Sequence, residues 1–216
     1  MTYQVVASHR TGSSLLNDYA LDYHDRVGFH EVFLDGPSYK FMAHLTIEEK
    51  FEFLEYYKKQ DIHFTTKIFP YEIISKGYEE RLFDYLKGYK ILTIKRNPWD
   101  AFLSHSYQDF CGWKTSHRRE GDDFIELQSF EIGLYKIKHF CKKWKTDFNF
   151  VQRLDIHHTF NYNDLTINNL KKYFNTTYDS PAKPSNINYE KIAINYRKAK
   201  ELFDYEMYSA GNRNNN

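Results

Sequence analysis

The stretch YQVVASHRTGSS, residues 3–14, decides the fold of this chain. Its first part, residues 3–8, is an apolar run that predicts a buried strand, and Leu15 and Tyr19 continue the chain with helical spacing. A tight turn between a strand and a helix directs free backbone N–H groups and the positive end of the helix dipole at one point. We therefore interpret residues 8–14, called the anion loop below, as a site for a phosphate or a sulfate.

The side chains of the anion loop agree with this interpretation. Arg10 supplies a positive charge, and the hydroxyls of Thr11, Ser13 and Ser14 surround Gly12 with hydrogen-bond donors. The same residues also suit an ordinary strand-to-helix turn, in which Ser and Gly only satisfy backbone geometry. The loop alone leaves both readings open.

The loop departs from the phosphate-binding pattern GxxxxGK[ST] of common nucleoside triphosphatases. Ala7 stands where the first Gly of that pattern belongs, and Ser13 stands where its Lys belongs. An ordinary ATP- or GTP-dependent kinase is therefore disfavoured.

Short apolar segments alternate with helical segments along the rest of the chain. Residues 46–59 predict a helix, because Thr46 and Glu49 form a capping-box pattern ahead of apolar residues on one face. Further strands are predicted over residues 62–69, 89–95 and 148–154. This alternation predicts an α/β fold of three layers, with a central, mainly parallel sheet and helices on both faces.

A second motif, RNPWDAFLS at residues 96–104, follows the predicted strand over residues 89–95. Asn97 and Pro98 are typical of a helix start. Arg96 and Ser104 are not needed for that start, and both could reach an anion above the carboxyl edge of the sheet. A surface ion pair and a packed serine remain the plain alternatives for these two residues.

Together the two motifs resemble those of sulfotransferases that use 3′-phosphoadenosine 5′-phosphosulfate. The anion loop is similar to the 5′-phosphosulfate loop of that family, and Arg96 with Ser104 eight positions later resembles its 3′-phosphate motif. The resemblance implies a P-loop-NTPase-like fold and transfer of a sulfuryl group to an acceptor hydroxyl, with no metal. It implies that Arg10 is catalytic and that Arg10, Thr11, Gly12, Ser13 and Ser14 bind the 5′-phosphosulfate, while Arg96 and Ser104 bind the 3′-phosphate.

The resemblance also suggests a general base for the acceptor hydroxyl. Glu31 lies about twenty residues past the anion loop, where a branch of the family that acts on tyrosyl residues carries a catalytic glutamate. His30 is the rival, because the cytosolic steroid and phenol enzymes use a histidine. Should neither act, His157 and His158 are the next candidates.

Two lysines complete the predicted site. Lys67 resembles a lysine that faces the transferring group in the glutamate-using branch, and Lys183 could approach the 3′-phosphate. Residues 160–165 resemble the F-x-Y-E-D-L stretch of the family and are interpreted as mainly structural. The RKGxxGDW loop of the steroid and phenol branch is absent from the sequence, so the chain looks closer to the glutamate-using branch.

Composition limits the other possibilities. The 216 residues predict a single domain over residues 1–210 and a disordered tail over residues 211–216. A net charge of +1 argues against a nucleic-acid partner, and no signal peptide or membrane-spanning run is visible, so we expect a cytoplasmic protein. Cys111 and Cys141 suggest neither zinc nor a disulfide. Residues 112–123 are interpreted as a loop that either covers the acceptor or is only solvated.

Two other functions stay open at this stage. An atypical P-loop phosphotransferase would bind ATP with magnesium, and a non-catalytic module would bind a nucleotide without turnover. The acceptor is also open between peptidyl tyrosine, a glycan and a small molecule, because no motif in the chain identifies it.

Overall fold

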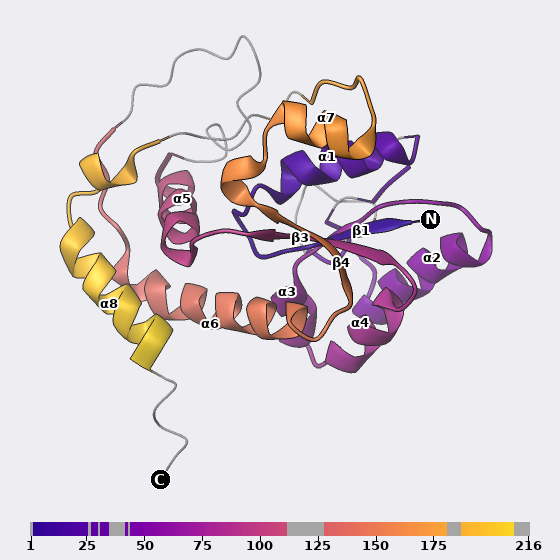
Figure 1. Cartoon of the computed structure of the whole chain (residues 1–216). Coiled ribbons are helices and arrows are strands. Elements are labelled where there is room, and N and C mark those ends of the chain that lie inside the picture. Colours follow the sequence, from indigo (N-terminus) through magenta and orange to yellow (C-terminus); the bar gives the residue numbers. More distant parts are fainter. Residues whose placement is uncertain are drawn as a thin grey trace.

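The computed structural model describes residues 2–25, 27–29, 31–34, 42, 44–111, 128–180 and 187–209. At its centre is a four-stranded sheet in the order β2-β1-β3-β4, in which every pair of neighbours is parallel (Figure 1). The strands are β1 (Tyr3–Val6), β2 (Lys67–Ile68), β3 (Lys90–Lys95) and β4 (Ile156–Asn161). The prediction of an α/β fold with a parallel sheet is confirmed.

Helices cover both faces of the sheet. They are α1 (Ser13–Tyr23), α2 (Ile47–Lys59), α3 (Pro70–Ile74), α4 (Glu79–Leu86), α5 (Pro98–Cys111), α6 (Leu134–Val151), α7 (Ile167–Phe174) and α8 (Tyr196–Tyr208), with short 3₁₀ helices η3 (Tyr162–Asp164) and η4 (Tyr189–Lys191). Figure 1 shows α1 and α7 on one face and α3 and α4 on the other. No helix in the described ranges combines the length and the apolar character that crossing a bilayer requires.

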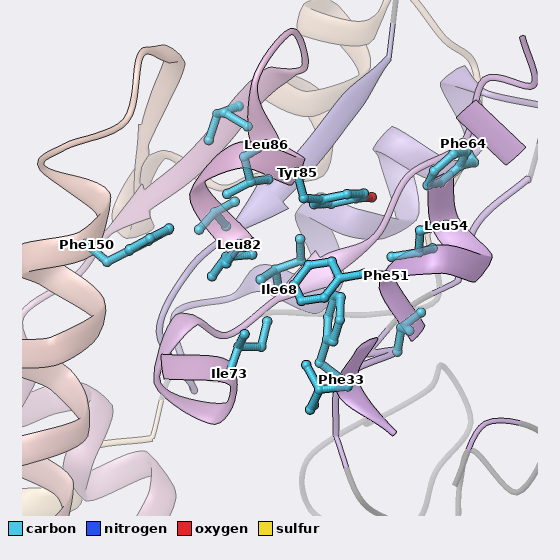
Figure 2. Packing of buried hydrophobic residues seen from close by; sticks show 14 of the residues in the cluster. Phe33, Phe51, Leu54, Phe64, Ile68, Ile73, Leu82, Tyr85, Leu86 and Phe150 are labelled. Carbon is cyan, nitrogen blue, oxygen red and sulfur yellow. The ribbon is translucent and has the colours of Figure 1, made fainter. Parts of the chain in front are cut away.

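Side chains that alternate along the strands belong to two apolar clusters, one on each face of the sheet. Val5 and Leu92 belong to the cluster under α1 and α7, whereas Val6 and Ile91 belong to the cluster under α2, α3 and α4. Successive residues of a strand point to opposite faces, so continuous apolar runs are needed where both faces are covered. Figure 2 shows the second of these clusters, in which aromatic rings fill the space beside β2.

A third apolar cluster joins α5, α6 and α8. At its edge the indole Nε1 of Trp99 donates to the Tyr196 hydroxyl at 3.0 Å. The Asn195 side chain pairs with the backbone of Ile132, accepting from its N–H at 2.9 Å and donating to its carbonyl at 3.0 Å. The first bond joins α8 to α5, and the other two join the N-cap of α8 to the segment that leads into α6.

The capping-box prediction for residues 46–59 is confirmed. Thr46 is the N-cap of α2, its hydroxyl accepts from the Glu49 N–H at 3.2 Å, and the Glu49 carboxylate accepts from the Thr46 N–H at 2.7 Å. Only Lys67–Ile68 of the predicted strand over residues 62–69 belongs to the sheet.

The predicted strand over residues 148–154 is wrong. Its first residues are the last turn of α6, and the fourth strand begins later, at Ile156. Phe150 is buried one turn after the buried Asp147, so the helical spacing of buried residues continues to that point. A short apolar run at the end of a long helix cannot be told from a strand by composition alone.

The aromatic core of Figure 2 makes a direct stability prediction. Phe51 on α2 is fully buried, so Phe51→Ala removes a buried ring and should lower the free energy of unfolding by about 3 to 5 kcal/mol. Tyr56 lies on the same helix and is 59% exposed, so Tyr56→Ala should change it by less than about 0.5 kcal/mol. Urea unfolding measures both variants, and a similar loss in both would contradict the assigned core.

Candidate functional site

The site lies at the carboxyl edge of the sheet, between the segments that follow β1 and β3. The chain passes from β1 to β2 on one side, and then crosses to β3 on the other side of β1. The direction of strand addition therefore reverses between β1 and β3, and such a reversal opens a crevice outside the carboxyl ends of the strands. Both sequence motifs begin at this point.

The anion loop makes a tight turn into α1. Gly12 is the N-cap of the helix with a φ of 85°, in the left-handed region that favours glycine. The Thr11 hydroxyl donates to the Ser8 carbonyl at 2.8 Å and closes the loop on itself. The first N–H groups of α1 thus point out of the end of the helix, as an anion site requires.

Space around Gly12 is also restricted. A Cβ at this position would lie 3.0 Å from Leu165 Cδ1 and 3.2 Å from Tyr162 Cε2. The segment after β4 therefore packs directly on the anion loop, and a side chain at position 12 would require Leu165 and Tyr162 to shift by a few tenths of an ångström.

The two motifs meet through Arg10. Its guanidinium Nε and Nη2 lie 3.4 and 3.3 Å from the Ser104 hydroxyl on α5, and its backbone carbonyl accepts from Arg96 Nη1. Arg96 and Ser104, which the sequence predicts to bind the 3′-phosphate, thus both contact Arg10, which it predicts to bind the 5′ group. This contact was not predicted, because the sequence analysis directed Arg10 toward the 5′ group alone.

Arg96 is packed into the site. Its guanidinium lies 3.8 Å from the centre of the Tyr162 ring, a cation–π arrangement. Burial lowers the pKa of Arg96, and burial together with the nearby Arg96 charge lowers that of Arg10, yet arginine starts so high that both remain charged. Among the described residues Arg96 Nε is buried without a hydrogen-bond partner, so it is an unsatisfied donor beside the anion loop.

Lys67 and Glu31 lie on the other side of the anion loop. Lys67 is 6% exposed, donates from Nζ to the Ser14 hydroxyl at 2.9 Å and forms an ion pair with Glu31. Both residues border a small open hollow whose other lining residues are Phe33, Leu34, Phe69 and Glu72. Lys67 therefore bridges the anion loop to the carboxylate that the sequence analysis proposed as the base.

The two histidines named as further base candidates lie elsewhere. His157 and His158 are at the start of β4, and the His157 ring is 5.8 Å from the ring of Tyr3. Because all strands are parallel, this is the amino edge of the sheet, opposite the site. Neither histidine can reach the anion loop, so neither is a candidate for the base.

Some predicted features cannot be placed. His30, Lys183, residues 112–123 and the tail at residues 211–216 lie outside the described residues. Within the described ranges no group of three or more His, Cys, Asp or Glu side chains is arranged to hold a metal ion.

Tyr162 is a residue of the site whose importance the sequence analysis missed. It contacts both Gly12 and Arg96, and it directly follows β4 (Ile156–Asn161). The signal that could have found it is its position, since the carboxyl ends of parallel strands meet at one edge of the sheet. The misplaced fourth strand hid that signal.

Comparison with known proteins finds a similarity in structure and no match in sequence. No family model and no curated protein matches the sequence. Among solved structures, the chain is similar to a sulfotransferase from Alicyclobacillus acidocaldarius, with 14% sequence identity and a TM-score of 0.43 over 98% of each chain.

The contact at Gly12 can be tested by comparing two glycines. Gly12 and Gly77 both have positive φ, of 85° and 89°, but a Cβ at Gly77 would meet nothing within 4 Å. Gly77→Ala should therefore cost only backbone strain, about 1 kcal/mol, whereas Gly12→Ala should cost at least about 1 kcal/mol more. Urea unfolding gives the difference, and equal losses would mean that Tyr162 and Leu165 move aside freely.

Proposed function

We propose that this chain is a sulfotransferase that moves a sulfuryl group from 3′-phosphoadenosine 5′-phosphosulfate to an acceptor hydroxyl. The observation that carries the proposal is the meeting of Arg10, Arg96 and Ser104 at the crevice between β1 and β3. Two guanidinium groups held close together favour a ligand that carries more than one anionic group, because each can then form a charge-assisted hydrogen bond.

The residues fit a nucleotide with phosphates at both ends of its ribose. The start of α1 and the Ser14 hydroxyl, which accepts from Lys67 and keeps its own hydrogen, offer donors to the 5′ group. The unpartnered Arg96 Nε and the Ser104 hydroxyl offer donors to a 3′-phosphate. AMP lacks that second phosphate and would leave Arg96 unsatisfied.

The proposed chemistry follows from these positions. In the proposed step the acceptor oxygen attacks the sulfur of the phosphosulfate in line with the bond to the phosphate. Negative charge then develops on the leaving phosphate oxygen. Arg10 and the N–H groups of the anion loop stabilise that charge, and Lys67 adds a second cation while it orients Ser14. Metal ions have no assigned role in this scheme.

Glu31 is proposed to accept the acceptor proton. Its carboxylate is held near the anion loop by the ion pair with Lys67, within the wall of the hollow that borders the loop. A carboxylate in this place can act as a base once the acceptor hydroxyl displaces part of its contact with Lys67. His30 remains the rival base.

The proposed acceptor is a peptidyl tyrosine, a glycan or a small molecule that bears a hydroxyl, and the hollow beside the anion loop is its proposed place. Phe33, Leu34 and Phe69 give it partly apolar walls, beside the charges of Glu31 and Lys67. The nucleotide site takes none of these wall residues. Acceptor binding and nucleotide binding should therefore be separable by mutation.

Two other functions make different demands on the same site. A phosphotransferase would need magnesium and would bind ATP, and a non-catalytic module would bind the nucleotide without turnover. Titration with 3′-phosphoadenosine 5′-phosphate, ADP and AMP, with and without EDTA, distinguishes the first. Turnover with a generic phenol or sugar acceptor distinguishes the second.

The first functional prediction concerns the 3′-phosphate. Arg96→Ala should weaken binding of 3′-phosphoadenosine 5′-phosphate by about 2 kcal/mol and leave AMP binding nearly unchanged, because only the former can use the lost charge-assisted contact. Calorimetric titration measures both ligands. Arg153→Ala is the control, since Arg153 is half-exposed and pairs with Glu79 away from the site. Equal losses for both ligands would rule out the assigned role.

The second functional prediction concerns the base. Glu31→Gln keeps the shape of the side chain but removes its basic oxygen, so turnover should fall about 100-fold while nucleotide affinity survives. Single-turnover sulfuryl transfer measures the rate, with nucleotide affinity measured in parallel. Exposed Glu52 on α2 provides the control variant Glu52→Gln. Normal turnover in Glu31→Gln together with loss in His30→Gln would assign the base to His30.

A further inference from the structure

The hollow beside the anion loop has a second carboxylate that the proposed reaction does not use. Glu72, in the first turn of α3, borders this hollow together with Glu31 and Lys67. The Glu72 side chain is 22% exposed and that of Glu31 is 20% exposed, so both carboxylates are partly buried. Each of them needs hydrogen-bond donors when a ligand displaces the water there.

Neighbouring side chains fix Glu72 and keep it ionised. Its Oε1 accepts from His9 Nε2 at 3.2 Å and forms an ion pair with Lys143 on α6. Burial would raise the pKa of Glu72, but the hydrogen bonds from His9 and Lys143 outweigh it and lower the pKa to about 2. At neutral pH the carboxylate can therefore accept hydrogen bonds and cannot donate them.

Both contacts of Glu72 use the same oxygen. Oε1 accepts from His9 and from Lys143, and within the described ranges no hydrogen bond reaches Oε2. A carboxylate oxygen at the wall of a hollow is satisfied by water or by a ligand that donates to it. Oε2 is thus the oxygen of Glu72 that remains for an acceptor.

Apolar side chains form the rest of the wall around these polar groups. Phe33, Leu34 and Phe69 border the hollow, and the Phe69 ring stacks on the His9 ring with ring centres 3.8 Å apart. Lys67 Nζ lies 5.6 Å from the centre of the Phe69 ring. Apolar surface beside a few fixed polar groups fits a sugar ring, which has C–H faces and hydroxyl groups at its edge.

A tyrosyl side chain would leave this carboxylate without a partner. Glu31 is the proposed base and takes the proton of the reacting hydroxyl, and a phenol has no second hydroxyl to offer Glu72. A site that binds a substrate hydroxyl discriminates against a substrate that lacks it, because a polar group of the site is then left unpaired. The hollow therefore favours an acceptor with at least two hydroxyl groups.

We propose that Glu72 is an acceptor-binding residue that selects a sugar, with at least two hydroxyl groups, over a tyrosyl side chain. One hydroxyl lies at Glu31 and receives the sulfuryl group, and a second hydroxyl donates to Glu72 Oε2. The inference rests on the proposed function for its reaction, but binding of a sugar in the hollow can be tested without the nucleotide.

The first arm of the test compares two classes of acceptor. Transfer of labelled sulfate from 3′-phosphoadenosine 5′-phosphosulfate is measured with methyl glucosides, galactosides and mannosides, and with N-acetyltyrosinamide as the phenolic acceptor. At least one sugar should have a kcat/KM about tenfold or more above that of N-acetyltyrosinamide. A higher kcat/KM for N-acetyltyrosinamide, or no transfer to any of the sugars, would overturn the proposal.

The second arm removes the charge of Glu72. Glu72→Gln keeps the size of the side chain and an oxygen that can accept from His9. The KM of the best sugar should rise about tenfold with little change in kcat, the loss expected for one hydrogen bond to a charged group. The kcat/KM of N-acetyltyrosinamide should not fall. Equal losses for both acceptors are the result of a merely structural role and would overturn the proposal.

The matched control is Glu79→Gln. Glu79, in the first turn of α4, is 41% exposed and pairs with Arg153 away from the hollow, so this variant should behave as wild type with both acceptors. Affinity for 3′-phosphoadenosine 5′-phosphate should be the same in wild type and in both variants, which also shows that they are folded. A large loss of that affinity in Glu72→Gln would mean that Glu72 acts through His9 and the anion loop, against the proposal.

The third arm needs no nucleotide. Saturation-transfer NMR should detect binding of the methyl glycosides to the free wild-type protein and a clear loss of that signal in Glu72→Gln. If wild type fails to bind 3′-phosphoadenosine 5′-phosphate but this difference is present, the proposed function fails and sugar binding at Glu72 stands. If the nucleotide binds and the sugars do not, the sugar acceptor is overturned and the proposed function stands.

Discussion

The contact between the Arg96 guanidinium and the Arg10 carbonyl joins the two segments on which the site depends. It exists because β1 and β3 are parallel neighbours, so the segments that leave them start side by side. An antiparallel pair would send these segments to opposite edges of the sheet. The parallel pairing thus brings together two residues that lie 86 positions apart in sequence.

This arrangement holds two positive charges in a partly buried place before any ligand arrives. Each guanidinium loses hydration, and each repels the other. The cost is offset by the Ser104 hydroxyl, the Tyr162 ring and the Arg10 carbonyl, which are polar or polarisable but carry no negative charge. An anion would complete the balance, and donors already fixed in place lose little entropy when it binds.

Much of the site could be predicted because its parts are local. Gly12 with its positive φ, the Asn97 cap whose Oδ1 accepts from the Trp99 N–H at 2.9 Å, and the Thr46 capping box all follow from a few consecutive residues. The misplaced fourth strand shows the limit of that reasoning. The apolar residues of the segment 148–154 suit a strand or a helix, and the packing of Phe150 goes with the helical form, in which α6 continues to Val151.

The sequence by itself determined the fold class and the two motif segments, because strand period, turn residues and helix caps act over a few neighbouring positions. Only the tertiary structure decided which distant side chains meet. It turned Arg10 toward Ser104, set Tyr162 against Arg96 and paired Lys67 with Glu31. The physical reason is that such contacts depend on strand order and helix packing, which are set by burial summed over the whole chain and leave no pattern near any one of these residues.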